Sequence, residues 1–417
     1  MKKIYIYSLV AAMFAASLAG CSSKTAAERN YKSETKEKTS VVSEKNESAS
    51  VAQLSNTEES TYTKRDLEQT ADTSEAQYIT VSDGENVSIT SEGVYVISGT
   101  AEGCTIRVEA DENAKVQLVL DGVSIENSDS PAIYVVSADK VFITTSDSEN
   151  ILTVSGEFKA DGETNTDAVI FSKDDLVLNG TGTLNVTSYY GNGITSKDDM
   201  KITGGTYNVK SALDAFEAND SISVSDGTFN IATNKDGFHC ENDEAEGTVT
   251  ISGGTFSING GSDGIQACSL LQIDGGTMTI QAPEGLEAAY ILINDGDINI
   301  NSSDDGVNVS KKSSSVTTPT FEINGGSLSI AMSGNDVDGI DANGNIIVSG
   351  GTIDITYPQQ GPSESFDYDG SAEFNGGTVI INGTEVSEIP SAMMGGGMHG
   401  GMNGGIQGGF GGRGGRF

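Results

Sequence analysis

An acidic residue opens a short phrase that recurs through the second half of the chain, and a small residue and an apolar residue follow it each time. Carboxylate oxygens are the ligands that hard divalent cations such as Ca²⁺ prefer. Like carboxylates held close together repel one another unless they are protonated or bridged by a cation. If the fold places these acidic residues one above another, the repeated phrase predicts a calcium site. The phrase begins at Asp214, Asp236, Asp263, Glu284, Asp305 and Asp338.

A second set of side chains follows three residues after these acids and is expected to face outward beside them. His239 belongs to this set and is either a further ligand or a surface residue. A competing interpretation is structural, because an Asp–Gly pair suits a tight turn in which the carboxylate caps backbone N–H groups. The predicted calcium ligands are Asp214, Glu217, Asp236, Asp263, Glu284, Glu287, Asp304, Asp305, Asp338 and Asp341.

The elements that position these acids are short strands. A Gly-Gly-Thr phrase with alternating apolar residues recurs at 204–209, 253–258, 275–280, 350–355 and 376–379. Alternation with a period of two predicts strands with one buried face, and the sequence leaves no room for crossover helices. Each repeat holds three such runs, which predicts an all-β fold over residues 77–390: a right-handed parallel β-helix with three short strands per rung and roughly 12 to 13 rungs.

The two ends of the chain differ from the repeats in composition. Residues 1–20 have the lysines and the apolar run of an export signal, and the small residues before Cys21 predict lipidation of that cysteine. Residues 21–76 are polar and are expected to form a disordered tether, while residues 391–417 form a Gly- and Met-rich flexible tail. We therefore expect an exported bacterial lipoprotein at the cell surface.

The charge of the chain limits its partners. It has 60 acidic against 23 basic residues and a formal net charge of −37. So negative a field repels nucleic acids and anionic lipid surfaces. Contact with a membrane is therefore expected only through the N-terminal lipid.

The first repeats add a more specific signal at residues 93–100, 116–125, 130–135 and 140–144. This series resembles the opening of a clostridial-type carbohydrate-binding family, which is similar in fold to the calcium-dependent family 9 pectate lyases. The resemblance covers about residues 78–390. It implies a secreted, Ca²⁺-loaded protein that binds acidic plant polysaccharide such as polygalacturonate, or cellulose, generally without cleaving it. Tyr189, Tyr190 and Tyr290 are the candidates for stacking on a sugar ring, although each could equally cover a turn.

Two other functions remain open from the sequence. A calcium-dependent pectate lyase needs a base beside the ion, and Lys235, next to Asp236, is the best candidate for it. The same lysine would also serve to neutralise its acidic surroundings. The second alternative is a structural surface adhesin that binds no sugar.

Overall fold

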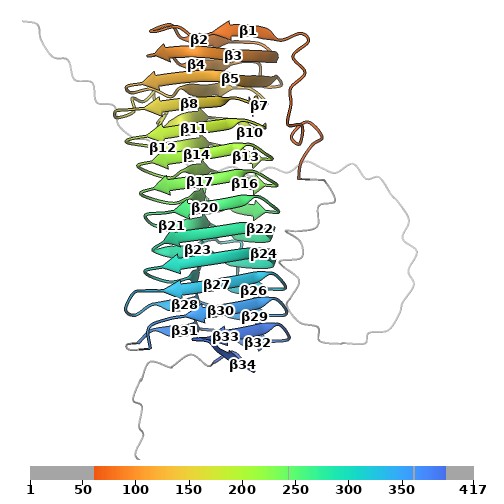
Figure 1. Ribbon diagram of the computed structural model, residues 1–417, viewed down its shortest axis with the longest axis vertical. Coiled ribbons are helices and arrows are strands. Elements are labelled where there is room, and N and C mark those ends of the chain that lie inside the picture. Colours follow the sequence, from red (N-terminus) through yellow and green to blue (C-terminus); the bar gives the residue numbers. More distant parts are fainter. Residues whose placement is uncertain (1–60, 243, 360–361, 391–417) are drawn as a thin grey trace, which may run out of the picture. The chain divides into compact units, whose positions relative to one another are not determined.

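The computed structural model describes residues 61–242, 244–359 and 362–390 (Figure 1). All of them belong to the second of two compact units, Glu59–Phe417. The predicted signal segment, the predicted lipidation site Cys21 and the predicted tail at 391–417 lie outside the described residues. Within the described residues every regular element is a strand, which confirms the all-β prediction. Those residues include no helix long and apolar enough to cross a membrane.

The strands form two hydrogen-bonded sheets, and the smaller one has twelve parallel strands. Each turn of the chain adds one strand to this sheet before the chain passes to the larger one. The strands of the smaller sheet are β2 (Val87–Ile89), β4 (Ile106–Glu109), β6 (Ile133–Ser137), β9 (Ala168–Ser172), β12 (Asn192–Ser196), β15 (Phe216–Ala218), β18 (Phe238–Cys240), β21 (Asp263–Ala267), β23 (Glu284–Ala288), β25 (Val307–Val309), β28 (Asp338–Ala342) and β31 (Glu364–Tyr368).

The larger sheet has 22 strands, stacked one above another in Figure 1. Its pairs are parallel apart from the last, in which β34 folds back antiparallel on β33. Its strands are β1 (Gln77–Thr80), β3 (Gly93–Glu102), β5 (Lys115–Asn127), β7 (Lys140–Thr145), β8 (Glu149–Val154), β10 (Asp175–Gly180), β11 (Thr183–Ser188), β13 (Asp199–Ile202), β14 (Thr206–Ser211), β16 (Ser221–Val224), β17 (Thr228–Thr233), β19 (Thr248–Ile251), β20 (Thr255–Asn259), β22 (Leu270–Ala282), β24 (Tyr290–Ser302), β26 (Thr320–Ile323), β27 (Ser327–Met332), β29 (Asn345–Val348), β30 (Thr352–Thr356), β32 (Ala372–Phe374), β33 (Thr378–Ile381) and β34 (Thr384–Val386).

The predicted right-handed β-helix with three short strands per rung is wrong as a description of these sheets. Hydrogen bonds join the strands into two sheets, of 12 and 22 strands, and not into three. Two of the three apolar runs of a repeat belong to the larger sheet, and in β5, β22 and β24 they form one strand of 13 residues. The physical reason lies at Gly276 and Gly296, whose φ angles of +98° and +119° bend β22 and β24 without ending them.

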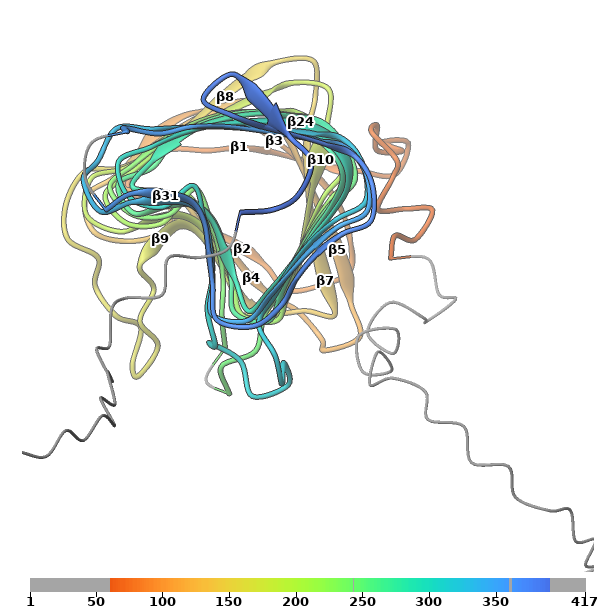
Figure 2. The same cartoon turned by 90° about the horizontal axis from the view of Figure 1, so that it is seen from below.

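The interior is one continuous apolar core that runs from Val81 to Ile389, and Tyr134, Ala168 and Phe171 form a small separate cluster. Because equivalent positions pair in register from turn to turn, identical side chains stack. Phe216 lies on Phe238 with ring centroids 4.8 Å apart, and Phe229 lies on Phe256 at 4.6 Å. Figure 2 looks along the long axis of this stack and shows the turns nearly superimposed.

Residues 61–69, which we call the N-terminal strap, correct the predicted tether boundary at residue 76. Asp66 is completely buried, and the Gln69 side chain bonds to Gly180 and Thr203 of the larger sheet. The strap is therefore part of the folded unit, which includes residues well before the expected start at residue 77.

The stacked rings in the core give a first testable prediction. Phe238→Ala removes a fully buried ring that contacts Phe216, so we expect the free energy of unfolding to fall by roughly 3–5 kcal/mol. Tyr78→Ala is the control, because Tyr78 is 73 % exposed and should change stability by no more than about 0.5 kcal/mol. Urea denaturation of both variants measures the difference. Equal losses would contradict the stacking argument.

Candidate functional site

The predicted acids do form a column, which we call the acid column. It crosses the smaller sheet at the N-terminal ends of its strands, one acid per turn. Asp263 pairs in register with Glu284, and Asp338 pairs with Glu364. Glu364 extends the column by one turn and was missed, because Ser365 stands where the other phrases have glycine or alanine. The acid, the small residue and the apolar residue were nevertheless a sufficient signal to find it.

In several carboxylates of the acid column, one oxygen accepts a hydrogen bond from a backbone N–H of the next turn. The backbone N–H of Asp236 donates to Asp214 Oδ1 at 3.0 Å, and that of Asp263 donates to Asp236 Oδ1 at 2.9 Å. The same bond joins Asp338 to Asp305 at 2.7 Å. The structural interpretation of the Asp–Gly turns is therefore right for one oxygen of each pair. The other oxygen of each carboxylate is not used in this bond and can contact a side chain, as Asp214 Oδ2 contacts Lys235 and His239.

A second column runs beside the first on the same strands. In-register pairing stacks Glu217 with His239 and, three turns later, Glu287 with Asn308. Asp367, which the sequence did not single out, continues it by pairing with Asp341. The complete second column is Glu217, His239, Gln266, Glu287, Asn308, Asp341 and Asp367.

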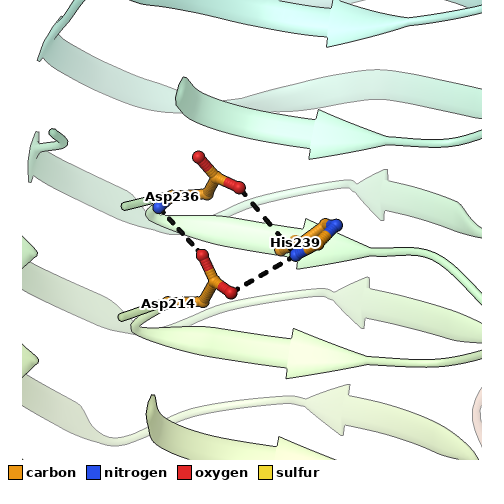
Figure 3. A group of neighbouring side chains, drawn as sticks. All are labelled: Asp214, Asp236 and His239. Carbon is orange, nitrogen blue, oxygen red and sulfur yellow. Dashed lines mark hydrogen bonds and ion pairs between the residues drawn. The ribbon is translucent and has the colours of Figure 1, made fainter. Parts of the chain in front are cut away.

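The first cluster in the columns already contains its own cations. Figure 3 shows Asp236 and His239 on one turn and Asp214 on the turn before it, with His239 Nδ1 3.3 Å from Asp214 Oδ2 and 3.8 Å from Asp236 Oδ2. Lys235 Nζ lies 3.0 Å from Asp214 Oδ2. Burial opposes ionisation of Asp214, but the His239 hydrogen bond and the two nearby cations lower its pKa to about 2. Lys197 pairs with Glu217 in the same way at 3.0 Å.

The middle cluster consists of Asp263, Glu284 and Glu287. One carboxylate oxygen of each lies within 4.8 Å of the others. Asp263 is only 6 % exposed, and no donor among the described residues hydrogen-bonds to its carboxylate. Burial and the charges of Asp236, Glu287 and Glu284 raise its pKa to about 8. Lys312 pairs with Glu287 and so neutralises only part of this cluster.

The last cluster has no such cation. Among the described residues, no lysine or arginine forms an ion pair with Asp305, Asp338 or Asp341. Burial, together with the surrounding carboxylates, raises the pKa of Asp305 to about 7 and the pKa values of Asp338 and Asp341 to about 6. Asp304 is exposed beside them, and its charge contributes to the shift at Asp305. Asp305 and Asp338 each accept a backbone N–H from the next turn, but among the described residues Asp305, Asp338 and Asp341 form no ion pair with a lysine or arginine.

A fourth acidic cluster lies on the larger sheet, away from the predicted columns. It contains Asp175, Asp198 and Asp199, and burial with neighbouring carboxylates raises the pKa of Asp198 to about 6. The sequence carried a signal for it, since Lys-Asp-Asp occurs at both 173–175 and 197–199. Lys140 lies 3.4 Å from Asp175 and partly neutralises the cluster.

The predicted sugar-stacking tyrosines differ in exposure. Tyr189 and Tyr190 are 57 % and 53 % exposed, so both present a ring surface to solvent. Tyr290 is buried in the sheet and donates a hydrogen bond to Glu322, which leaves it no free ring face. Burial and Glu322 raise its pKa. Stacking on a sugar is therefore possible in geometry only for the first two.

Lys235 is poorly suited to act as a lyase base. Burial alone would lower the pKa of this lysine, but the charge and hydrogen bond of Asp214 raise it above the ordinary value. A general base must be deprotonated near the working pH, which requires a lowered pKa in a lysine. The geometry favours the interpretation that Lys235 neutralises the acid column.

Comparison with known proteins fits this description. Residues 83–336 and 284–409 match a family described as carbohydrate-binding domain-containing proteins. The chain belongs to this carbohydrate-binding family. One relative with the same description, from Acetivibrio thermocellus, is 40 % identical over 121 residues. That match covers 28 % of this chain and 42 % of the relative, so the shared part is less than half of either protein.

One solved structure is also similar. It is a gadolinium derivative of a polysaccharide lyase-like protein from C. thermocellum, with a TM-score of 0.40 and 22 % sequence identity. The match covers 72 % of this carbohydrate-binding chain and 98 % of that protein.

The raised pKa values of the acid column predict how stability depends on pH without calcium. A carboxylate whose pKa is about 8 in the folded state but near 3.8 when unfolded destabilises the fold as pH rises, because only the unfolded chain ionises freely. In chelator, the melting temperature should therefore be highest near pH 4 and fall toward pH 8. Asp263→Asn should make that fall smaller. A melting temperature that rises over this range would contradict the assignment.

Proposed function

We propose that the chain is a calcium-dependent protein that binds acidic polysaccharide, such as polygalacturonate, along the acid column. The observation that carries this proposal is the set of partly buried carboxylates without a lysine or arginine partner at Asp305, Asp338 and Asp341, whose pKa values are raised. In register, such groups repel unless a proton or a cation lies between them. Ca²⁺ is the hard divalent cation expected outside the cell.

The residues present fit that ion. Each column position offers carboxylate oxygens, and the Asp263 carboxylate is buried with no hydrogen-bond donor among the described residues. Asp263, Glu284 and Glu287 would hold one ion, because one oxygen of each lies within 4.8 Å of the others. Asp305, Asp338 and Asp341 do not form so close a group, so an ion there would need oxygens of the sugar chain to complete its shell. Asp214, Asp236 and Glu217 are weaker candidates, because Lys235, His239 and Lys197 already supply positive charge there.

The ion would supply a positive charge that an acidic protein and an acidic polymer can share. Ca²⁺ takes roughly 6–8 oxygen ligands, more than two or three side chains provide. Carboxylates and hydroxyls of the sugar chain would complete the shell. Because the columns run along the stack, a polyuronate lying parallel to them could meet ion after ion. The exposed rings of Tyr189 and Tyr190 offer additional contact with sugar.

Retention on immobilised polygalacturonate tests this proposal. The parent protein should bind in Ca²⁺ and elute in chelator, and the double variant Asp305→Asn, Asp341→Asn should lose at least about tenfold in affinity while keeping its shape. The matched control is Asp121→Asn with Asp297→Asn, which removes the same charge at exposed positions of the larger sheet. Equal retention of both double variants would place binding elsewhere. Release of unsaturated uronide would instead identify a lyase, and no retention at all would favour an adhesin.

The proposed place of action is the outer surface of the cell, with the protein held by lipid on Cys21. Cys21→Ala removes the lipid attachment site, so the protein should move from the membrane fraction to the medium. Immunoblots of the two fractions measure this. Ser22→Ala is the neighbouring control and should leave partitioning unchanged. Unaltered partitioning of the cysteine variant would exclude this anchor.

A further inference from the structure

The N-terminal strap covers a patch on the outer face of the larger sheet. Along β7 the side chains of Val141 and Ile143 point into the core, so Phe142 between them points outward. Phe142 is nevertheless only 1 % exposed, and Asn179, an outward residue of β10, is 0 % exposed. The strap is what removes these outward side chains from water.

The strap is held by polar and cation–π contacts. The Arg65 guanidinium lies 4.4 Å from the centre of the Phe142 ring and donates to Gln117 Oε1 at 3.3 Å. Gln69 donates to the Thr203 carbonyl at 2.9 Å and accepts from the Gly180 N–H at 2.9 Å. None of these four strap contacts involves a residue of the apolar core, so releasing the strap would leave the core intact.

A lysine pair lies at the centre of the patch. Asp66 of the strap is fully buried, with Lys140 Nζ 3.8 Å from Oδ1 and Lys201 Nζ 4.0 Å from Oδ2. Oδ2 accepts a bond from the Thr63 N–H of the strap itself, but Oδ1 accepts no hydrogen bond. Both lysine contacts are long for charged hydrogen bonds, which usually measure about 2.7–2.9 Å. The strap carboxylate therefore occupies the space between the lysines without satisfying them.

We propose that this patch is a second binding site, for a carboxylated sugar chain without a bridging ion, and that the strap occupies it in competition with that ligand. Only the ligand class rests on the proposed function. A uronate carboxylate would pair with Lys140 and Lys201 in place of Asp66. The Phe142 face would carry a sugar ring, and Asn179 and Thr203 would bond to its hydroxyls. An aromatic face flanked by an amide and a hydroxyl suits a sugar better than a peptide.

The site differs from the acid column in location and in charge. It lies on β7, β10 and β13 of the larger sheet, whereas the column lies on the smaller sheet. Its lysines meet a carboxylate directly, so chelation of Ca²⁺ should not weaken it. The acidic cluster of Asp175, Asp198 and Asp199 lies beside the lysines, and Asp175, 3.4 Å from Lys140, partly neutralises them. Lys201 is also held by the Thr61 carbonyl at 2.7 Å.

Binding in chelator tests the site separately from the calcium-dependent function. In the full chain, the triple variant Arg65→Ala, Asp66→Ala, Gln69→Ala loosens the strap. Since a tethered segment competes at an effective concentration in the millimolar range, its removal should tighten trigalacturonate binding by at least about tenfold in calorimetry with chelator. Adding Lys140→Met and Lys201→Met should cancel that gain. If the triple variant binds trigalacturonate no more tightly than the parent protein, the second site is overturned. If the parent protein is not retained on polygalacturonate in Ca²⁺ but the gain in chelator is seen, only the acid-column function is overturned.

Proteolysis of the unaltered protein provides a test that needs no variant. Arg65 is covered by its contact with Phe142, so trigalacturonate should displace it and accelerate tryptic cleavage after Arg65 in chelator, followed by mass spectrometry. The neutral trisaccharide cellotriose should have no effect. An unchanged rate at saturating trigalacturonate would contradict competition with the strap. Equal acceleration by triglutamate would contradict the assignment to sugar.

Discussion

Parallel pairing that keeps equivalent residues in register, apart from local shifts at β3–β5, β4–β6 and β22–β24, is the constraint on which the rest of this molecule depends. Each turn of the chain hydrogen-bonds to the turns before and after it, so equivalent residues lie one above another about 4.8 Å apart. Each side chain therefore contacts the side chain at the equivalent position of the next repeat. Such contacts stabilise the fold where two copies of the same residue type attract each other, and they destabilise it where two like charges repel.

The chain responds to that constraint differently at different positions. Inside, phenylalanines stack with nearly parallel planes, as at Phe229 and Phe256. On the outer face, the Asn208 amide donates to Asn185 at 2.8 Å, and Asn230 donates to Asn208 at the same distance. Carboxylates have no such self-complementary bond. In the acid column they accept a backbone N–H from the next turn, pair with lysine or histidine, or retain a proton at unusually high pH.

The sequence predicted the position of the acid column because a phrase repeated in register must stack, and Asp263 and Glu284 do so. It did not predict the strand count, since alternation marks an apolar run but does not reveal whether a glycine such as Gly276 ends a strand or bends it. Lys312 was also missed, because it reaches Glu287 from a loop with no repeated pattern. The burial of Asp66 depends on partners more than 70 positions away, which local composition cannot report.

The antiparallel pair of β33 and β34 has a consequence for how copies of this protein behave toward one another. A stack of parallel strands can in principle continue without limit, because its terminal strand displays the same unpaired donors and acceptors that every internal strand uses. Here Thr384–Val386 reverses and bonds to 379–381, so the growing end of β33 is occupied by the chain itself. A second molecule therefore cannot pair in register with β33. The three residues of β34 are enough to block end-to-end polymerisation into a fibre at that strand.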